Sequence, residues 1–334
     1  MNKFRTIPVF VPELACPNRC TYCNQHLISG QLQIPSKEEI VEKIETHLNT
    51  FPPNVHVEVG FFGGNFTGIE TETQEFLLKI IQPYIQQEKI HAIRLSTRPD
   101  YINEEKLVLL RKYHVKTIEL GVQSTDDEVL KQTQRGYDSR CVETASELIH
   151  SFGFELGLQM MIGLPGDTKE KSVQTARKII ELGASQTRIY PTLVIENTEL
   201  AAQYLKGEYT PLSLNEAVDI AKEILLLFEQ SNVNILRVGL HPTEGFISGS
   251  DFLAGPFHVS FKELVLTEIW GEILRKIPLT DAKELILEVP RAEINYAIGY
   301  HAKNKRNLEK VFQKVQFVAS DSLTEREYIP HFKT

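Results

Sequence analysis

The stretch Cys16-Pro17-Asn18-Arg19-Cys20-Thr21-Tyr22-Cys23 follows the first apolar run of the chain, Thr6–Val11. Three thiolates with the spacing Cys-x3-Cys-x2-Cys can bind one metal centre and leave one coordination position open. Thiolates favour soft centres, so an iron-sulfur cluster and zinc are both candidates. For zinc, His26 would supply the fourth ligand. A third interpretation is that these cysteines only pack. Cys141 stands alone in a helical pattern, where it indicates a small apolar side chain and no ligand.

The composition is that of a globular protein with a sizeable core. The chain has 334 residues, of which 42% are hydrophobic, and 36 Lys and Arg against 44 Asp and Glu give a net charge of −8. The length fits about two domains, or one barrel with an extension. No apolar run approaches the roughly 18 residues that a membrane span needs, and the proline-broken start does not match a signal peptide. We therefore expect a cytoplasmic protein with no membrane partner.

Apolar runs typical of buried strands alternate with helical patterns through the first two thirds of the chain, which predicts parallel β/α units. The expected strands are Thr6–Val11, His56–Phe62, Ala92–Ser96, Thr117–Gly121, Glu155–Ile162 and Gln186–Pro191. We predict an α/β fold in which residues 1–212 form a partial, TIM-like (β/α)6 barrel. Residues 213–334 are expected to form a C-terminal α+β extension that caps the barrel and could bind substrate. In such folds the chemistry collects at the carboxyl ends of the strands.

The cysteine stretch and the later strand-end loops resemble the radical SAM superfamily, and in particular the radical SAM core of the Elongator catalytic subunit. Oxygen-independent coproporphyrinogen III dehydrogenases are more distant relatives. The loops that carry this resemblance are Phe62-Gly63-Gly64-Asn65-Phe66, Ser96-Thr97-Arg98-Pro99-Asp100, Gly121-Val122-Gln123-Ser124, Gln134-Arg135-Gly136-Tyr137, Gln159–Gly166 and Ile189–Ile195. The resemblance covers roughly residues 5 to 230. It implies that Cys16, Cys20 and Cys23 hold a 4Fe-4S cluster whose open iron binds S-adenosylmethionine.

The same resemblance implies roles for residues of the strand-end loops. The cofactor site would be formed by Gly63, Gly64, Asn65, Ser96, Arg98, Gln123, Arg135, Gln159 and Tyr190. Gln123 would contact the ribose, Arg135 the methionyl carboxylate, and Tyr22 and Tyr190 the adenine. Ser96 and Gln159 stand where relatives carry acidic residues, so their ribose contacts are the least supported. If Arg135 serves the cofactor and not the fold, Arg135→Ala should leave the melting temperature almost unchanged.

The implied reaction starts with an electron from the reduced cluster, which cleaves S-adenosylmethionine and yields a 5'-deoxyadenosyl radical. That radical would abstract a hydrogen atom from a substrate carbon, and an external donor of the flavodoxin or ferredoxin class would supply the electron. The Elongator resemblance points to tRNA or another RNA as substrate, and the porphyrin relatives point to a small molecule. The alternative from another class is a non-catalytic iron-sulfur or zinc protein.

The C-terminal part carries three further features. No Gly-x-Gly or Gly-x-Ala turn occurs in residues 213–334, so we expect no acetyl-CoA site there. The Gly/Pro-rich loop 240–258 is expected to close over the barrel mouth, where His241 or His258 could be catalytic. Residues 300–314 carry Lys303, Lys305, Arg306, Lys310 and Lys314 against Glu309, beside Tyr300, His301 and Phe312. This patch either grips RNA or is a solvated face.

Overall fold

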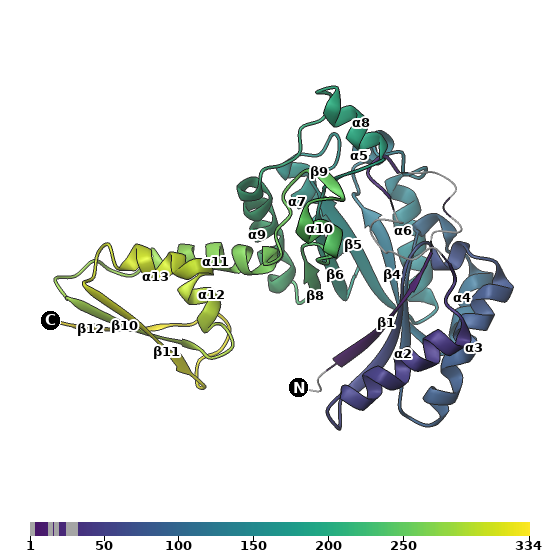
Figure 1. Ribbon diagram of the computed structural model, residues 1–334, viewed down its shortest axis with the longest axis horizontal. Coiled ribbons are helices and arrows are strands. Elements are labelled where there is room, and N and C mark those ends of the chain that lie inside the picture. The colour runs from purple at the N-terminus through teal and green to yellow at the C-terminus, as the bar shows by residue number, and fades with distance from the viewer. Residues whose placement is uncertain (1–3, 13–15, 17–19, 25–32) are drawn as a thin grey trace.

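A computed structural model describes residues 4–12, 16, 20–24 and 33–334. Its main element is a curled sheet of seven parallel strands in the order β1-β2-β3-β4-β5-β6-β8 (Figure 1). The strands are β1 (Phe4–Val11), β2 (His56–Gly63), β3 (Ala92–Thr97), β4 (Val115–Gln123), β5 (Glu155–Ile162), β6 (Gln186–Pro191) and β8 (Asn234–Val238). The fold is an α/β half-barrel, as the sequence predicted.

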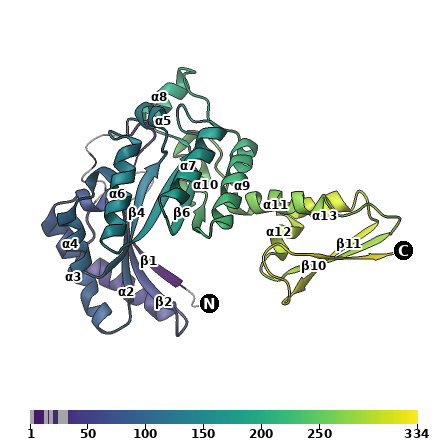
Figure 2. The same cartoon turned by 180° about the vertical axis from the view of Figure 1, so that it is seen from behind.

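The helices that connect these strands lie around the outside of the sheet (Figures 1 and 2). They are α2 (Lys37–Thr50), α3 (Thr71–Gln86), α4 (Glu104–Lys112), α5 (Asp127–Gln132), α6 (Ser139–Ser151), α7 (Lys169–Glu181), α8 (Glu199–Leu205) and α9 (Leu214–Gln230). Ser36 and Ser213 start α2 and α9 with complete capping boxes, which satisfy backbone donors that would otherwise be unpaired. Fully buried Ile, Leu and Val side chains of strands and helices fill the space between the two layers.

The sheet has one strand more than the six expected. The additional strand is β8, which pairs with β6 in parallel and so belongs to the barrel. Helix α9 packs against α7 on the outside of the same sheet. The physical reason is that the α9 segment supplies a sixth crossover, which the strand pattern alone did not reveal. The division of the chain at residues 212 and 213 stays a prediction.

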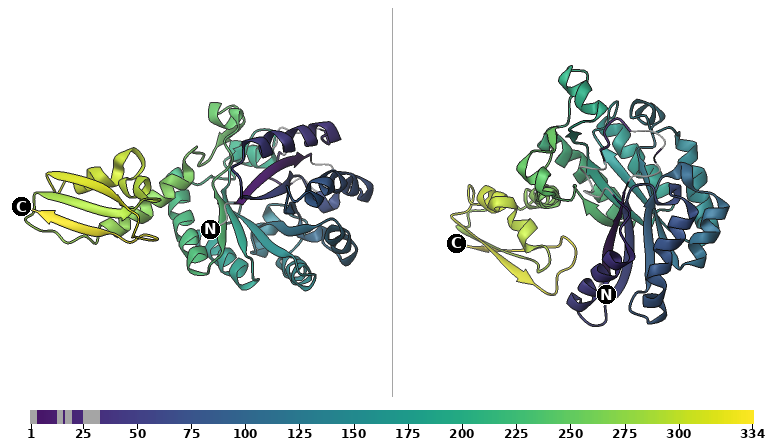
Figure 3. Two further views of the ribbon diagram at one scale, coloured as in Figure 1. Left: turned by 90° about the horizontal axis from the view of Figure 1, so that it is seen from below. Right: turned by 45° about the vertical axis from the view of Figure 1, so that its right-hand side comes forward.

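Residues beyond β8 form a second sheet, which stands beside the barrel (Figure 3). Strands β10 (Glu284–Pro290), β11 (Lys314–Ser320) and β12 (Ile329–Lys333) have the order β11-β10-β12. Helices α11 (Phe261–Leu274), α12 (Ile294–Ile298) and α13 (Lys303–Leu308) accompany this sheet. Helix α11 joins the two parts, since Val265 belongs to the barrel core and Trp270 to the core of the second sheet. The second sheet therefore stands beside the barrel, and the capping role expected for residues 213–334 stays a prediction.

The Gly/Pro-rich segment 240–258 does return to the end of the barrel. It contains α10 (Glu244–Ser248) and β9 (Phe252–Ala254), and β9 pairs with β7 (Val194–Ile195), which follows β6. Phe246 of this segment packs with Leu193 and Ile195 in a small hydrophobic cluster. Among the described residues, no helix is both long and apolar enough to cross a membrane.

Candidate functional site

The second and third cysteines of the motif lie in a turn at the carboxyl end of the barrel. The N–H of Cys23 donates to the carbonyl of Cys20 over 3.0 Å. Between them, the N–H of Thr21 donates to the carbonyl of Thr133 over 3.2 Å. The carbonyl of Thr21 accepts from the N–H of Leu200 over 2.7 Å. Cys20 itself is 7% exposed. Backbone hydrogen bonds to two distant segments therefore fix this turn.

Arg135 is buried directly against the turn. Its Nη1 lies 3.1 Å from the sulfur of Cys20 and 3.1 Å from the hydroxyl of Tyr22. Its Nε donates to the hydroxyl of Tyr137 over 3.0 Å, and its Nη2 donates to the carbonyl of Gly121. A solvated charge at a helix end would have none of these partners. Arg135 is instead a buried cation that joins β4 to the cysteine turn.

Arg98 supplies a second cation next to the same sulfur. Its Nη1 lies 3.9 Å from the sulfur of Cys20, and its Nη2 donates to the carbonyl of Arg135 over 2.6 Å. Asp100 holds the guanidinium through two hydrogen bonds of 2.9 and 2.8 Å. Two guanidinium groups at one sulfur favour a negatively charged centre there, and N–H donors to sulfur are a known control on cluster potential. The donor set fits a thiolate-bound cluster.

The Gly63-Gly64-Asn65 loop lies against the end of β1, which leads into the cysteine motif. Gly63 has φ +109°, and a Cβ at this position would sit 2.4 Å from the carbonyl oxygen of Val11. The N–H of Gly64 donates to the same carbonyl over 3.0 Å. Only glycine permits this close crossing of two backbones. Asn65 is buried, and its Oδ1 accepts hydrogen bonds from Thr97 and from the N–H of Arg98, so it orients the next strand-end loop.

Among the predicted cofactor residues, Gln123 has a buried side-chain oxygen that lacks a hydrogen-bond donor in the described part of the chain. It ends β4 at an irregularity in the β4–β5 register and has φ +70°. Its side-chain Oε1 is buried and has no hydrogen-bond partner among the described residues. A buried amide oxygen without a partner is costly, so a ligand hydroxyl is the natural donor for it. This observation fits the expected ribose contact.

Ser96 and Gln159 meet inside the barrel, in a network that the sequence analysis missed. The Nε2 of Gln159 donates to Ser96 (3.1 Å) and to Glu119 (2.9 Å). Glu119 is 1% exposed and pairs with Arg94 (2.8 Å) and Arg188 (2.6 Å). Burial alone would raise the pKa of Glu119, but hydrogen bonds from Arg188 and the charge of Arg94 outweigh it and lower that pKa.

A sequence signal for this network existed. Four strands of the sheet, β2, β3, β4 and β6, each place a charged side chain in the barrel interior, and these residues are Glu58, Arg94, Glu119 and Arg188. Glu58 completes the chain of charges through an ion pair of 2.6 Å with Arg94. Charges in the middle of buried strands are rare unless they are paired. The pattern therefore indicates a shared polar layer in the barrel interior.

The two expected adenine neighbours lie in different surroundings. Tyr22 is buried in the cysteine turn, and burial raises the pKa of its hydroxyl although the nearby Arg135 opposes this. Tyr190 lies at the end of β6, where burial raises the pKa of its hydroxyl although the charge of nearby Arg188 opposes this. Both hydroxyls are thus held neutral. Their contact with an adenine stays a prediction.

The ligand assignment of the three cysteines also stays a prediction. In the part of the chain that the structure describes, no group of three or more His, Cys, Asp or Glu side chains is arranged to hold a metal ion. His26, the alternative zinc ligand, lies outside the described residues. Cys141 differs from Cys20 in its surroundings, because burial and the nearby Asp100 and Asp138 raise the pKa of its thiol to about 11. A thiol held protonated is a poor ligand.

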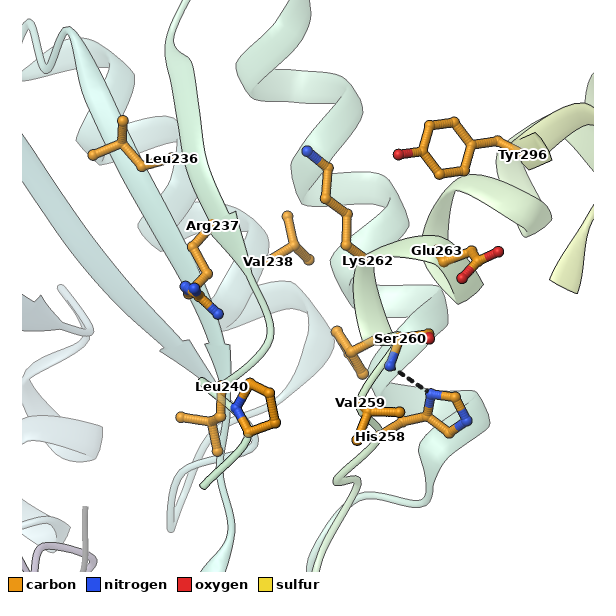
Figure 4. A pocket seen from close by; sticks show the side chains of 12 residues that line it. Leu236, Arg237, Val238, Leu240, His258, Val259, Ser260, Lys262, Glu263 and Tyr296 are labelled. Atoms are coloured by element: carbon orange, nitrogen blue, oxygen red, sulfur yellow. Dashed lines mark hydrogen bonds between the residues drawn. The ribbon is translucent and has the colours of Figure 1, made fainter. Parts of the chain in front are cut away.

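The two candidate histidines contact other parts of the described chain than the cysteine turn. His241 is exposed, and its Nδ1 lies 3.4 Å from Arg237. The Nδ1 of His258 accepts from the N–H of Ser260 (3.0 Å), and its ring meets that of Tyr300 at 5.1 Å. His258 also lines a cavity of about 360 Å³ between β8 and α11 (Figure 4). A catalytic role for either imidazole stays a prediction.

This half-barrel, with a cysteine motif at its carboxyl end, defines the class of protein. The radical SAM superfamily matches residues 13–179, half of the chain, and the Radical_SAM C-terminal domain matches residues 184–270. The chain belongs to the radical SAM superfamily. It is an enzyme of that superfamily, and its cofactors are a 4Fe-4S cluster and S-adenosylmethionine.

Within the superfamily, the chain is similar to Elongator proteins. A tRNA uridine(34) acetyltransferase of Methanocaldococcus infernus is 29% identical over 217 residues, which cover 58% of this chain and 40% of that protein. Elongator complex protein 3 of Saccharomyces cerevisiae is 31% identical over 191 residues, which cover 51% and 34%. The chain thus spans well under two thirds of either relative. The solved archaeal Elp3 of M. infernus with an N-terminal deletion superposes with a TM-score of 0.67 at 22% identity, covering 81% of this chain and 64% of that one, and shows the shared fold.

Proposed function

We propose that this enzyme abstracts a hydrogen atom from a carbon of an RNA substrate, with tRNA the first candidate. The observation that carries the radical chemistry is the Cys20 sulfur at the barrel end, faced by the guanidinium groups of Arg98 and Arg135. The RNA substrate is supported by the similarity to an acetyltransferase named for tRNA uridine 34. Because the chain spans only part of that relative, the acetyl transfer itself is not carried over.

In this proposal Cys16, Cys20 and Cys23 hold the cluster. When bound, the cluster supplies the electron that cleaves S-adenosylmethionine and so produces the adenosyl radical. Arg135 positions the Cys20 turn and donates to its sulfur. The unpartnered Oε1 of Gln123 accepts a ribose hydroxyl, which relieves a buried acceptor. A one-electron donor of the flavodoxin or ferredoxin class reduces the enzyme from outside.

Isotope transfer tests the proposal. The protein is reconstituted anaerobically with iron and sulfide, reduced with dithionite, and given S-adenosylmethionine with perdeuterated tRNA. We expect release of methionine and of 5'-deoxyadenosine that contains deuterium, measured by mass spectrometry. Cys20→Ala serves as the inactive control.

Two results would contradict the proposal at different levels. If the iron-loaded protein forms no 5'-deoxyadenosine, the alternative of a non-catalytic iron-sulfur or zinc protein would replace the proposed enzyme. Release of 5'-deoxyadenosine that never carries deuterium from the RNA would assign the enzyme to a small-molecule substrate.

A further inference from the structure

The C-terminal sheet and its helices, from β10 onward, lie outside both family matches, which end at residue 270. The strands and helices of this C-terminal unit follow an order of their own. Strand β10 leads into α12. A four-residue loop (Gly299-Tyr300-His301-Ala302), which contains the irregular 3₁₀ turn η3 (Tyr300–Ala302), then leads into α13, and β11 returns beside β10 in parallel. Strand β12 pairs with the other edge of β10 in an antiparallel direction. Helices lie over one face of this sheet (Figure 1). Its hydrophobic core includes Trp270 and Leu287. The unit is thus a β-α-α-β fold whose two helices are joined by a Gly-x-x-Ala loop.

The loop backbone is held in a conformation that residues other than glycine rarely adopt. Gly299 has φ +86°, and His301 and Ala302 have φ +48° and +55°. Such conformations persist only where the surroundings enforce them. Here the N–H of Tyr300 donates to the hydroxyl of Thr267 over 2.9 Å, and the N–H of Ala302 donates to the carbonyl of Gly299 over 2.8 Å. The loop shape is therefore built into the fold.

Asn304 connects the loop region to α11. It is 4% exposed, and its Nδ2 donates to the carbonyl of Thr267 over 2.9 Å. A Cβ at Gly271 would lie 2.9 Å from the Oδ1 of Asn304, and a Cβ at Gly299 would lie 3.0 Å from its backbone nitrogen. Two glycines thus make room for this one side chain. The buried contacts leave the outer side of the loop to solvent, where His301 is exposed.

The outer side of the loop combines aromatic rings with positive charge. The rings of Tyr300 and His301 meet edge to face at 4.2 Å. Lys303 pairs with Glu268, and Lys305 lies 3.7 Å from Glu309. Exposed pairs of this kind contribute little and exchange readily for another anion. Arg306 and Lys310 are exposed and have no carboxylate partner in the described ranges. Phe312, by contrast, is 2% exposed and cannot stack a base, which corrects the expectation from sequence.

We propose that the loop 299–302, with the cations that follow it, clamps the backbone of a single-stranded segment of RNA. Modules of the KH class bind about four nucleotides through a Gly-x-x-Gly loop between two helices, and this unit presents the corresponding loop with alanine at the fourth position. Unstacked bases stack on aromatic side chains, and Tyr300 and His301 offer such faces. The choice of RNA rests on the proposed function, whereas the placement of the clamp rests on this loop.

The clamp adjoins a cavity at the edge of the barrel, whose lining carries the cations Arg237 and Lys262 and the carboxylate of Glu263. The ring of His258 contacts Tyr300 and lines the cavity between β8 and α11. Arg237 of β8 and Lys262 of α11 line the same cavity from opposite walls (Figure 4), and the charge of Lys262 also acts on the nearby carboxyl group of Glu293. Because β8 is the last strand of the half-barrel, RNA held at the loop would pass this cavity on its way to the barrel.

Binding of short oligonucleotides to the full-length reconstituted protein tests the clamp. The probe is a fluorescein-labelled RNA decamer of mixed sequence, with the DNA decamer of the same sequence in parallel, and fluorescence anisotropy reports the dissociation constant. The double variant Tyr300→Asp/His301→Asp places two carboxylates on the loop, and aspartate tolerates a positive φ. We expect its dissociation constant for RNA to rise at least tenfold. Gln313→Glu/Gln316→Glu adds the same charge at exposed positions beside and within β11 and should change it less than twofold.

A second variant tests the clamp without changing the loop itself, in case the double variant does not fold. Arg306→Ala removes one exposed cation, and the slope of log affinity against log salt should fall by about 0.7 if that cation contacts a phosphate. Unchanged affinity of the loop variant, an equal loss in the β11 control, or equal affinity for DNA would each overturn the proposal. Affinity for RNA is measured without S-adenosylmethionine, so intact binding without deuterium transfer from tRNA would contradict the proposed function and leave the clamp standing.

Discussion

The guanidinium of Arg135 donates a hydrogen bond to the sulfur of Cys20 over 3.1 Å, although 115 residues separate them in the sequence. The cation reaches this sulfur because the loop after α5 crosses the end of β4, where the carbonyl of Gly121 accepts from the same guanidinium. One side chain thus links the sheet to the cysteine motif. The cofactor site and the fold therefore share polar contacts through this side chain.

Arg135→Ala should destabilise the cofactor-free protein by about 3 kcal/mol, because the Gly121 carbonyl and the hydroxyls of Tyr22 and Tyr137 each lose a hydrogen bond from a buried guanidinium. Denaturant unfolding of the apoprotein measures this loss. The sequence analysis expected almost none, and the buried contacts change that expectation. Arg140→Ala removes an exposed cation in α6 and should be nearly neutral. Equal midpoints for the two variants would refute the structural role of Arg135.

Cys20→Ala should abolish binding of the cluster, whereas Cys141→Ala should retain it. The thiol of Cys141 has its pKa raised to about 11 by burial and neighbouring carboxylates, so it is protonated at neutral pH. Iron and sulfide are counted per chain after anaerobic reconstitution. A Cys141→Ala protein as poor in iron as Cys20→Ala would establish a site with four cysteines and no open position.

Gly63→Ala should cost more stability than Gly153→Ala, although both glycines have positive φ. The strain of placing alanine at positive φ is roughly 1 kcal/mol at either site. A Cβ at Gly63 also meets the Val11 carbonyl at 2.4 Å, which adds about 1–3 kcal/mol, whereas a Cβ at Gly153 meets nothing within 4 Å. Urea unfolding of the two apoproteins measures the difference. Similar losses would show that the crossing of β1 and β2 can relax.

Glu119→Gln should weaken the protein most at neutral pH, by about 3 kcal/mol, because Arg94 and Arg188 lose their shared carboxylate. The pKa of Glu119 is lowered in the fold, so the stability from its charge is present above the unfolded pKa and is lost as pH falls through the lower folded value. The difference in free energy of unfolding between wild type and Glu119→Gln should therefore become smaller from pH 7 toward pH 3.

Thermal unfolding across this pH range provides the measurement. Glu75→Gln removes an exposed ion pair with Lys79 and serves as the control, with little effect expected at any pH. A constant gap between wild type and Glu119→Gln down to pH 3 would show that the charge of Glu119 does not stabilise the barrel interior.

The sequence by itself determined the local elements and the type of chemistry. Strands β5 and β6 have the predicted bounds, because their apolar patterns are set by neighbouring residues. The cysteine spacing and the strand-end motifs indicated the superfamily, since a short loop carries them. Gly63 was predicted as part of the site for the same reason.

Only the tertiary structure decided which distant groups meet. Arg135, which was predicted to bind the cofactor, is enclosed by β4 and the cysteine turn, and Asn65 accepts hydrogen bonds from the Thr97–Arg98 loop; the contacts of both with the cofactor stay predictions. Strand β8 joined the barrel because its pairing with β6 spans α9, which no local pattern encodes. The loop 299–302 is held by Thr267 from another helix. Local periodicity depends on adjacent residues, whereas burial, charge pairing and loop conformation depend on contacts that form only when the whole chain packs.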